Sequence, residues 1–111
     1  MAQVIVAYID RDNRTRIELT SGGAPVEEDT VTRAVFLFGS YCLDTDEVDD
    51  ADYIQLSADK TEVYLWLGLV PNLTVGRYTG YLTVYDSTTP NGLAWGPTVT
   101  VSAREWNVCE G

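Results

Sequence analysis

The stretch of residues 62–86 constrains the fold most, because apolar and polar side chains alternate along both of its halves. Alternation with a period of two residues predicts β-strands, since successive side chains of a strand point to opposite faces. One face of each half is aliphatic, as expected where one face of a sheet packs on a core. The residues expected on the core side are Val63, Leu65 and Leu67, followed by Tyr78, Gly80, Leu82 and Val84.

The two halves meet at a corner that carries Gly76 and Tyr78. Immunoglobulin-like sandwiches often place a Tyr near the start of a late strand, with its hydroxyl bonded to the backbone just upstream. Tyr78 fits this role. Gly76, two residues earlier, permits a close backbone approach or a positive φ. We therefore interpret both residues as fold-specifying.

Other apolar or alternating runs, separated by turn signals, predict further strands. They cover residues 3–9, 14–19, 31–39, 53–57 and 98–103. The charged turn at residues 10–13 predicts that the second run is the hairpin partner of the first. Seven or eight short strands without a crossover helix favour an all-β, immunoglobulin-like antiparallel β-sandwich. We expect a single domain at residues 1–104 and a C-terminal tail at residues 105–111.

The charge of the chain excludes several classes of partner. Seventeen Asp and Glu against seven Lys and Arg give a net charge of −10, which is the wrong sign for nucleic acid. An anionic membrane would repel the chain, and no apolar run approaches the roughly 20 residues of a membrane-spanning helix. The N-terminus lacks the features of a secretory signal, so we expect synthesis in a cytoplasm. Cys42 and Cys109 are then expected to be free thiols.

Catalytic motifs are missing from the sequence. The chain contains no His, the commonest general base and a common metal ligand. It has no G-x-S-x-G motif, and the Gly pair at residues 22–23 lacks the strand-to-helix context of a phosphate loop. We therefore expect no enzyme, no catalytic residue and no bound cofactor.

Residues 44–52 carry six carboxylates in nine positions. Mutual repulsion favours an exposed, solvated loop. Contact with a basic partner surface is an alternative. A calcium site is another, although the segment lacks the spacing and central Gly of an EF-hand. Its five hard ligands would be Asp44, Asp46, Asp49, Asp50 and Asp52.

Aromatic side chains suggest contacts with other proteins. If Tyr64, Trp66, Tyr81 and Tyr85 face outward together, they form a patch too apolar for an isolated monomer. Packing in the core is the alternative explanation for this set, which also includes Tyr41 and Trp95. The turn at residues 90–97 presents two apolar side chains, and the first strand offers a free edge. The residues we expect at an interface are Leu93, Trp95, Trp106, Trp66 and Tyr81.

The pattern LxLGxxxxLxxGxYxxxLxVYDxxxPNGxxWGxxVxV runs from Leu65 to Val101. Together with the strand at residues 31–39, it resembles the small immunoglobulin-like virion proteins of tailed bacteriophages, which are found on heads, necks and baseplates. The resemblance implies a structural protein of a virion, made in the host cytoplasm. Its partners would be major capsid or tail proteins, bound in multiple copies without nucleic acid or membrane.

Three functions follow from these observations. The first is a capsid decoration or cement subunit that stabilises the particle by protein–protein contacts. The second is a structural component of the neck, tail or baseplate. The third belongs to another class, a module that binds carbohydrate or a cell-surface ligand through outward Tyr and Trp side chains.

Overall fold

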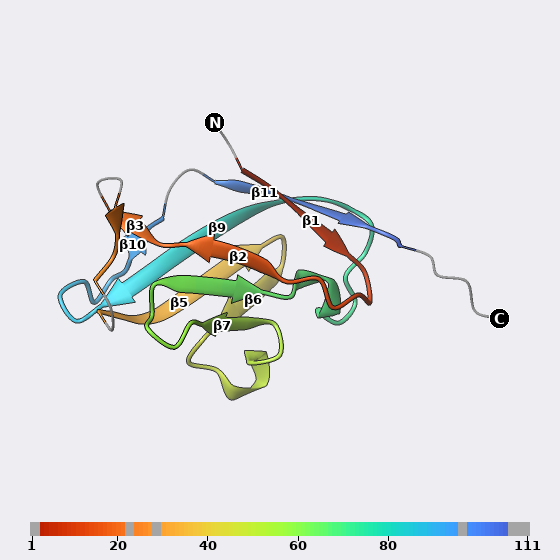
Figure 1. Ribbon diagram of the computed structural model, residues 1–111. Helices are drawn as coiled ribbons and strands as arrows, with labels where there is room; N and C mark the ends of the chain where they lie inside the picture. Colours follow the sequence, from red (N-terminus) through yellow and green to blue (C-terminus); the bar gives the residue numbers. More distant parts are fainter. Residues whose placement is uncertain (1–2, 22–23, 28–29, 96–97, 107–111) are drawn as a thin grey trace.

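The computed structural model describes residues 3–21, 24–27, 30–95 and 98–106. These residues form two β-sheets packed as a sandwich-like single domain with almost no helix (Figure 1). The larger sheet has the spatial order β1 (Gln3–Tyr8), β11 (Val99–Arg104), β9 (Gly76–Asp86), β5 (Val31–Phe38) and β6 (Tyr41–Asp44), and β10 (Leu93–Ala94) pairs with β9. The smaller sheet has the order β2 (Thr15–Glu18), β8 (Glu62–Leu65) and β7 (Ile54–Leu56). The short strands β3 (Thr20–Ser21) and β4 (Ala24–Pro25) pair with each other.

Two single-turn 3₁₀ helices complete the described part of the chain, η1 (Val48–Asp50) and η2 (Leu67–Leu69). The sequence predicted no helix and seven or eight strands. The described residues contain eleven strands, three of them only two residues long.

The predicted hairpin of the first two strands is wrong. β1 pairs in parallel with β11 in the larger sheet, whereas β2 pairs with β8 in the smaller one. Asp10 begins the crossing with a positive φ of 64°, and its amide donates to the carbonyl of Gly68 at 2.8 Å. A charged turn can lead into either sheet, and here it connects Ile5, buried on the larger sheet, to Ile17, buried on the smaller one. The parallel pair also makes the sandwich less than fully antiparallel.

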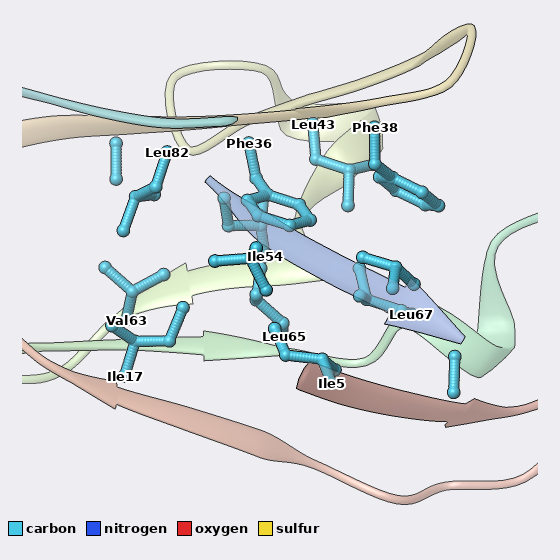
Figure 2. Packing of buried hydrophobic residues seen from close by; sticks show 14 of the residues in the cluster. Ile5, Ile17, Phe36, Phe38, Leu43, Ile54, Val63, Leu65, Leu67 and Leu82 are labelled. Atoms are coloured by element: carbon cyan, nitrogen blue, oxygen red, sulfur yellow. The ribbon is translucent and has the colours of Figure 1, made fainter. Parts of the chain in front are cut away.

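The core lies between the two sheets, where buried side chains from both layers point toward one another (Figure 2). Phe36 and Phe38 of β5 and Val63 and Leu65 of β8 are fully buried. The alternation in residues 62–86 therefore predicted the core side of β8 correctly. The same holds for Leu82 and Val84 of β9.

Gly80 occupies a core-facing position of β9 directly above the ring of Phe36. A Cβ atom on this residue would lie 2.6 Å from Cζ of Phe36. A larger residue at position 80 would therefore compete with the aromatic ring for the same space.

The corner before β9 is built around Tyr78. Its hydroxyl donates to the carbonyl of Thr74 at 2.8 Å and lies 2.9 Å from the hydroxyl of that Thr. This backbone bond is the contact that the tyrosine-corner interpretation requires. Gly76 has a φ of +156°, and a Cβ atom there would meet no atom within 4 Å. Gly is therefore favoured at position 76 by its backbone conformation and not by a lack of room for a side chain.

Candidate protein interface

The outward side of the larger sheet carries two neighbouring rows of uncharged side chains. Residues directly opposite each other on paired strands share a face, so the strand register defines these rows. The first row crosses β1, β11 and β9, and the second crosses β9, β5 and β6. We call these six residues the uncharged face: Val4, Thr100 and Thr79 in the first row, and Tyr81, Leu37 and Cys42 in the second.

Three large apolar or aromatic side chains of the uncharged face are exposed to solvent. Val4 is 60% exposed, Tyr81 52% and Leu37 42%. A cluster of exposed Tyr and aliphatic side chains without charges has the composition of the centre of a protein interface. In a chain of net charge −10, two adjacent rows without charge distinguish this surface from its surroundings.

Charged groups border the uncharged face at both ends. Arg77 lies opposite Ser102, in the row after Thr79 and Thr100. Asp44 lies opposite Val35 at the other end, in the row after Leu37 and Cys42. An uncharged centre with charges at its margin is the usual arrangement of a protein interface.

Asp44, the charged residue that borders the uncharged face at β6, forms an ion pair. Arg33 Nε donates to Asp44 Oδ1 at 2.9 Å, and its Nη2 bonds the second carboxylate oxygen. The same guanidinium lies 4.8 Å from the ring centre of Tyr85. The hydrogen bonds from Arg33 hold the pKa of Asp44 below its usual range and raise the pKa of Arg33.

This ion pair corrects the prediction that residues 44–52 form a solvated loop throughout. Asp44 is buried because Arg33 binds its carboxylate. The carboxylate of Asp50 accepts the amide hydrogen of Asp44 at 3.0 Å, which ties the segment back to the sheet. Asp46, Glu47, Asp49 and Asp52 are exposed, as predicted. Among the described residues, no three carboxylates or thiols are grouped so that they could hold a metal ion.

The four aromatic residues that would form one patch if they faced outward together lie on two different sheets. Tyr81 and Tyr85 point outward from the larger sheet, since they alternate with buried residues of β9. Tyr64 of β8 and the following Trp66 belong to the smaller sheet, with ring centres 6.3 Å apart. A single combined patch is therefore wrong.

Core packing accounts for other members of the aromatic set. Tyr41 packs against the core, and its hydroxyl donates to the carbonyl of Asn72 at 2.7 Å. Trp95 also packs against the core, with its amide bonded to the carbonyl of Leu82 at 2.8 Å.

The outward side of the smaller sheet is charged and internally bonded. Arg16 and Glu62 form an ion pair at 3.0 Å. The hydroxyl of Tyr64 donates to Glu62 at 3.1 Å, which raises the pKa of Tyr64. Arg14 lies over the Tyr64 ring at 4.4 Å from its centre. These charged groups of the face are therefore bonded within the sheet.

The predicted interface residues are therefore not brought together. Tyr81 lies on the uncharged face and Trp66 on the opposite sheet. Leu93 is 45% exposed but lies opposite the core-facing Val84 in register. Of the two large apolar side chains of this turn, Trp95 is half-buried and Leu93 is exposed, while Gly96 and Pro97 lie outside the described residues.

Trp106, the remaining predicted contact, packs edge-on against Tyr8 with ring centres 5.2 Å apart. It belongs to the two residues of the predicted tail that the structure describes, while Cys109 lies outside them. Cys42 is exposed and has a free thiol.

Sequence reasoning missed Val4 and Leu37. Leu37 stands between Phe36 and Phe38 in a run that is apolar on both faces, so alternation could not assign its side. Its cross-strand partner Tyr81 was predicted to face outward, and the pairing of these two residues would have placed Leu37 correctly.

No protein-family model matches the chain, and a search of curated proteins found no match. In the described ranges, no helix is long and apolar enough to cross a membrane.

Proposed function

We propose that this chain is an immunoglobulin-like structural protein of a tailed-bacteriophage virion, and that it decorates the capsid as a cement subunit. The uncharged face carries the proposal, because it offers an exposed contact surface on an otherwise acidic chain. Each bound copy stabilises the shell by its binding free energy, which requires no chemistry at the contact. The absence of His from the sequence is consistent with such a role.

Strand order supports the immunoglobulin-like part of the proposal. In chain order, the smaller sheet corresponds to strands B, E and D of immunoglobulin domains. The larger sheet corresponds to G, F, C and C′, with β1 joined to its edge. Tyr78 then stands near the start of strand F, where a tyrosine corner belongs.

Charge supports the decoration role in two ways. A net charge of −10 keeps unbound copies apart and steers them toward basic regions of an assembled particle. The absence of charge on the uncharged face lowers the desolvation cost of the final contact. The acidic segment at residues 44–52 borders this face through Asp44 and could contribute to the steering.

The test is binding to purified particles that lack this protein. The natural chain is expected to bind the shell in many copies and to raise the melting temperature of the particle. Leu37→Asp places a charge at the centre of the uncharged face, and we expect it to weaken binding by about 100-fold. The matched control is Gln55→Asp, at an exposed strand position of the smaller sheet, which should bind as the natural chain does.

Equal binding by Leu37→Asp and the natural chain would remove the uncharged face from the proposal. Binding in only a few copies at a vertex or on the tail would favour the second function, a neck, tail or baseplate component. Failure of the natural chain to bind any virion component would overturn both structural functions.

The carbohydrate-binding alternative receives less support from the aromatic side chains. The ring of Tyr64, one of the expected stacking platforms, is covered by the guanidinium of Arg14. Tyr81 is open but stands between Leu37 and Thr-rich neighbours rather than beside a second open ring. Binding of the isolated chain to a glycan array would restore this alternative.

A further inference from the structure

A small cavity lies where β1 and β11 end together, beyond the last row of the larger sheet. It has a volume of about 240 Å³ and is lined by Tyr8, Arg11, Asn13 and Trp106. Ligand pockets for whole small molecules usually measure roughly 300–1,000 Å³. This cavity is therefore suited to one functional group or one side chain rather than to a nucleotide or an oligosaccharide.

The turn after β1 holds Arg11 in place at this cavity. The amide of Arg11 donates to the carbonyl of Tyr8 at 3.1 Å, and Asp10 between them has a φ of 64°. Tyr8 and Trp106 contribute two aromatic rings in edge-to-face contact. Trp106 is 55% exposed, so one wall of the cavity consists of a side chain that solvent largely surrounds.

Arg11 carries an unmet hydrogen-bonding requirement. Its Nε is buried and has no hydrogen-bond partner, and no other side-chain nitrogen or oxygen in the described part of the chain shares that state. A buried donor without an acceptor is costly, most of all on a charged group. An acceptor brought to Arg11 by a ligand would remove this cost.

Arg33 shows which acceptor suits this edge of a guanidinium. Its Nε and Nη2 together bind both oxygens of the carboxylate of Asp44. A planar carboxylate matches this pair of donors. The corresponding donor of Arg11 has no such partner among the described residues.

The surrounding charges favour an anion with a single charge. Arg104 lies opposite Tyr8, and Arg77 lies opposite Ser102 one row away. Neither these two residues nor Arg11 forms an ion pair within the described residues. Exposed carboxylates of the same segments, from Asp10, Asp12 and Glu105, would repel an anion of higher charge.

We propose that the cavity binds a single carboxylate, with Arg11 as the charged donor and the rings of Tyr8 and Trp106 against its aliphatic stem. The carboxylate belongs to an acidic side chain or chain end of a polypeptide, or to a small free acid. This inference goes beyond the proposed function and does not depend on it, because all four lining residues belong to this chain.

Binding must uncover Nε of Arg11, which no solvent reaches in this structure. We therefore expect the ligand to shift the ring of Trp106, an aromatic wall of the cavity that is 55% exposed. Such a shift changes the fluorescence of this Trp.

The experiment titrates the whole chain with N-acetyl-glutamate N-methylamide, and its neutral match is N-acetyl-glutamine N-methylamide. Binding is followed by Trp fluorescence and by the nuclear magnetic resonance signal of the Arg Nε–H groups. The acidic probe should shift one Nε–H signal with a dissociation constant on the order of 1 mM, and the neutral probe should not. No shift, or equal shifts with both probes, would overturn the proposal.

Two variants assign the site. Arg11→Lys should remove the shifted signal and weaken binding by about tenfold, since Lys cannot present the paired donors. The matched control is Arg14→Lys, because Arg14 lies over Tyr64 of the smaller sheet. This variant should bind the acidic probe as the natural chain does. Trp106→Phe should lose the fluorescence change while the Arg11 signal still responds. Loss of binding in Arg14→Lys as well would contradict the assignment.

Acetate distinguishes the two sources of the carboxylate. Tighter binding of the glutamate probe than of acetate supports a polypeptide ligand, because only the probe has a stem for the rings of Tyr8 and Trp106. Equal affinities support the carboxylate site with a small free acid as its ligand.

Discussion

The outward faces of the two sheets differ in how their polar groups are used. On the smaller sheet, Arg16 and Tyr64 both bond to Glu62, and Arg14 covers the Tyr ring. On the larger sheet, two adjacent rows have no charge, and Val4, Leu37 and Tyr81 are exposed. Both faces belong to strands with the same alternation, so secondary structure does not explain the difference.

The two outward faces differ in what they contribute to folding and to the binding of a partner. Exposed charges bonded within one face keep that face soluble and add little to folding. Exposed apolar side chains also add little to folding of the free chain, but they contribute strongly when a partner covers them. The larger sheet is therefore the better candidate for contact, and the smaller sheet serves as its internal control.

The largest expected effect on stability comes from the layer beneath the uncharged face. Gly80→Ala would place a Cβ atom 2.6 Å from Cζ of the fully buried Phe36. Overpacking of this kind should lower the free energy of unfolding by about 1–3 kcal/mol, measured by urea denaturation. Thr79→Ala, one residue away on the outward side, should change it by less than about 0.5 kcal/mol. Equal losses in both variants would show that the two sides of β9 are not distinct in packing.

The next effect concerns the ion pair that borders the uncharged face. Asp44→Asn removes the charge that Arg33 binds and should lower the free energy of unfolding by roughly 1–2 kcal/mol, less than for a fully buried pair because Arg33 is partly exposed. Asp46→Asn is the control, since its carboxylate lies 3.6 Å from Arg33 Nε and is largely exposed. A loss as large in the control would contradict the special role of Asp44.

The same pair predicts a dependence on pH. The pKa of Asp44 in the folded chain lies below its ordinary value of 3.8, chiefly because of the bonds from Arg33. At pH values below about 3.8 the unfolded chain binds a proton that the folded chain does not yet bind, so stability falls as the pH decreases. The contribution is complete above this range and disappears once the folded carboxyl is protonated.

Asp59 and Asp86 also have lowered pKa values, caused mainly by bonds from Thr61 and Thr88, so the natural chain must be compared with Asp44→Asn. The difference in stability between the two should shrink as the pH falls below about 3.8. A constant difference down to acid unfolding would refute this account.

The smallest effect is expected on the smaller sheet. Arg16 is 60% exposed in its ion pair with Glu62, so Arg16→Ala should cost less than about 1 kcal/mol. The loss should shrink further in 1 M salt, where screening is strong. If Arg16→Ala and Asp44→Asn destabilise the chain equally, the contrast between the two faces does not extend to their ion pairs.

The sequence predicted local features well because they depend on neighbours along the chain. Alternation assigned the core side of Val63, Leu65, Leu82 and Val84 correctly. The hydroxyl of Tyr78 makes the backbone bond expected from its place before a late strand. Each of these inferences needs only residues within one strand or one turn.

The errors arose where a partner from elsewhere in the chain decides the outcome. Alternation does not say which sheet a strand joins, so the first two strands were predicted to pair with each other. Asp44 was predicted to be solvated because its partner Arg33 lies eleven positions away, across the turn between β5 and β6. Trp95 was predicted to be exposed on its turn, yet its side chain packs against the core. The candidate site was therefore visible only in part, through Tyr81.

The parallel pairing of β1 with β11 has a mechanical consequence. β1 begins beside the start of β11, at Gln3 and Val99, and both strands end together at Tyr8 and Arg104. The chain thus enters this pair at one end and leaves it at the other. A force applied to the two chain ends pulls the strands along their common axis, so that the hydrogen bonds between them bear the load in shear at the same time. Strands loaded at one end would instead separate bond by bond. The shear geometry of β1 and β11 therefore makes this sandwich well suited to resist tension.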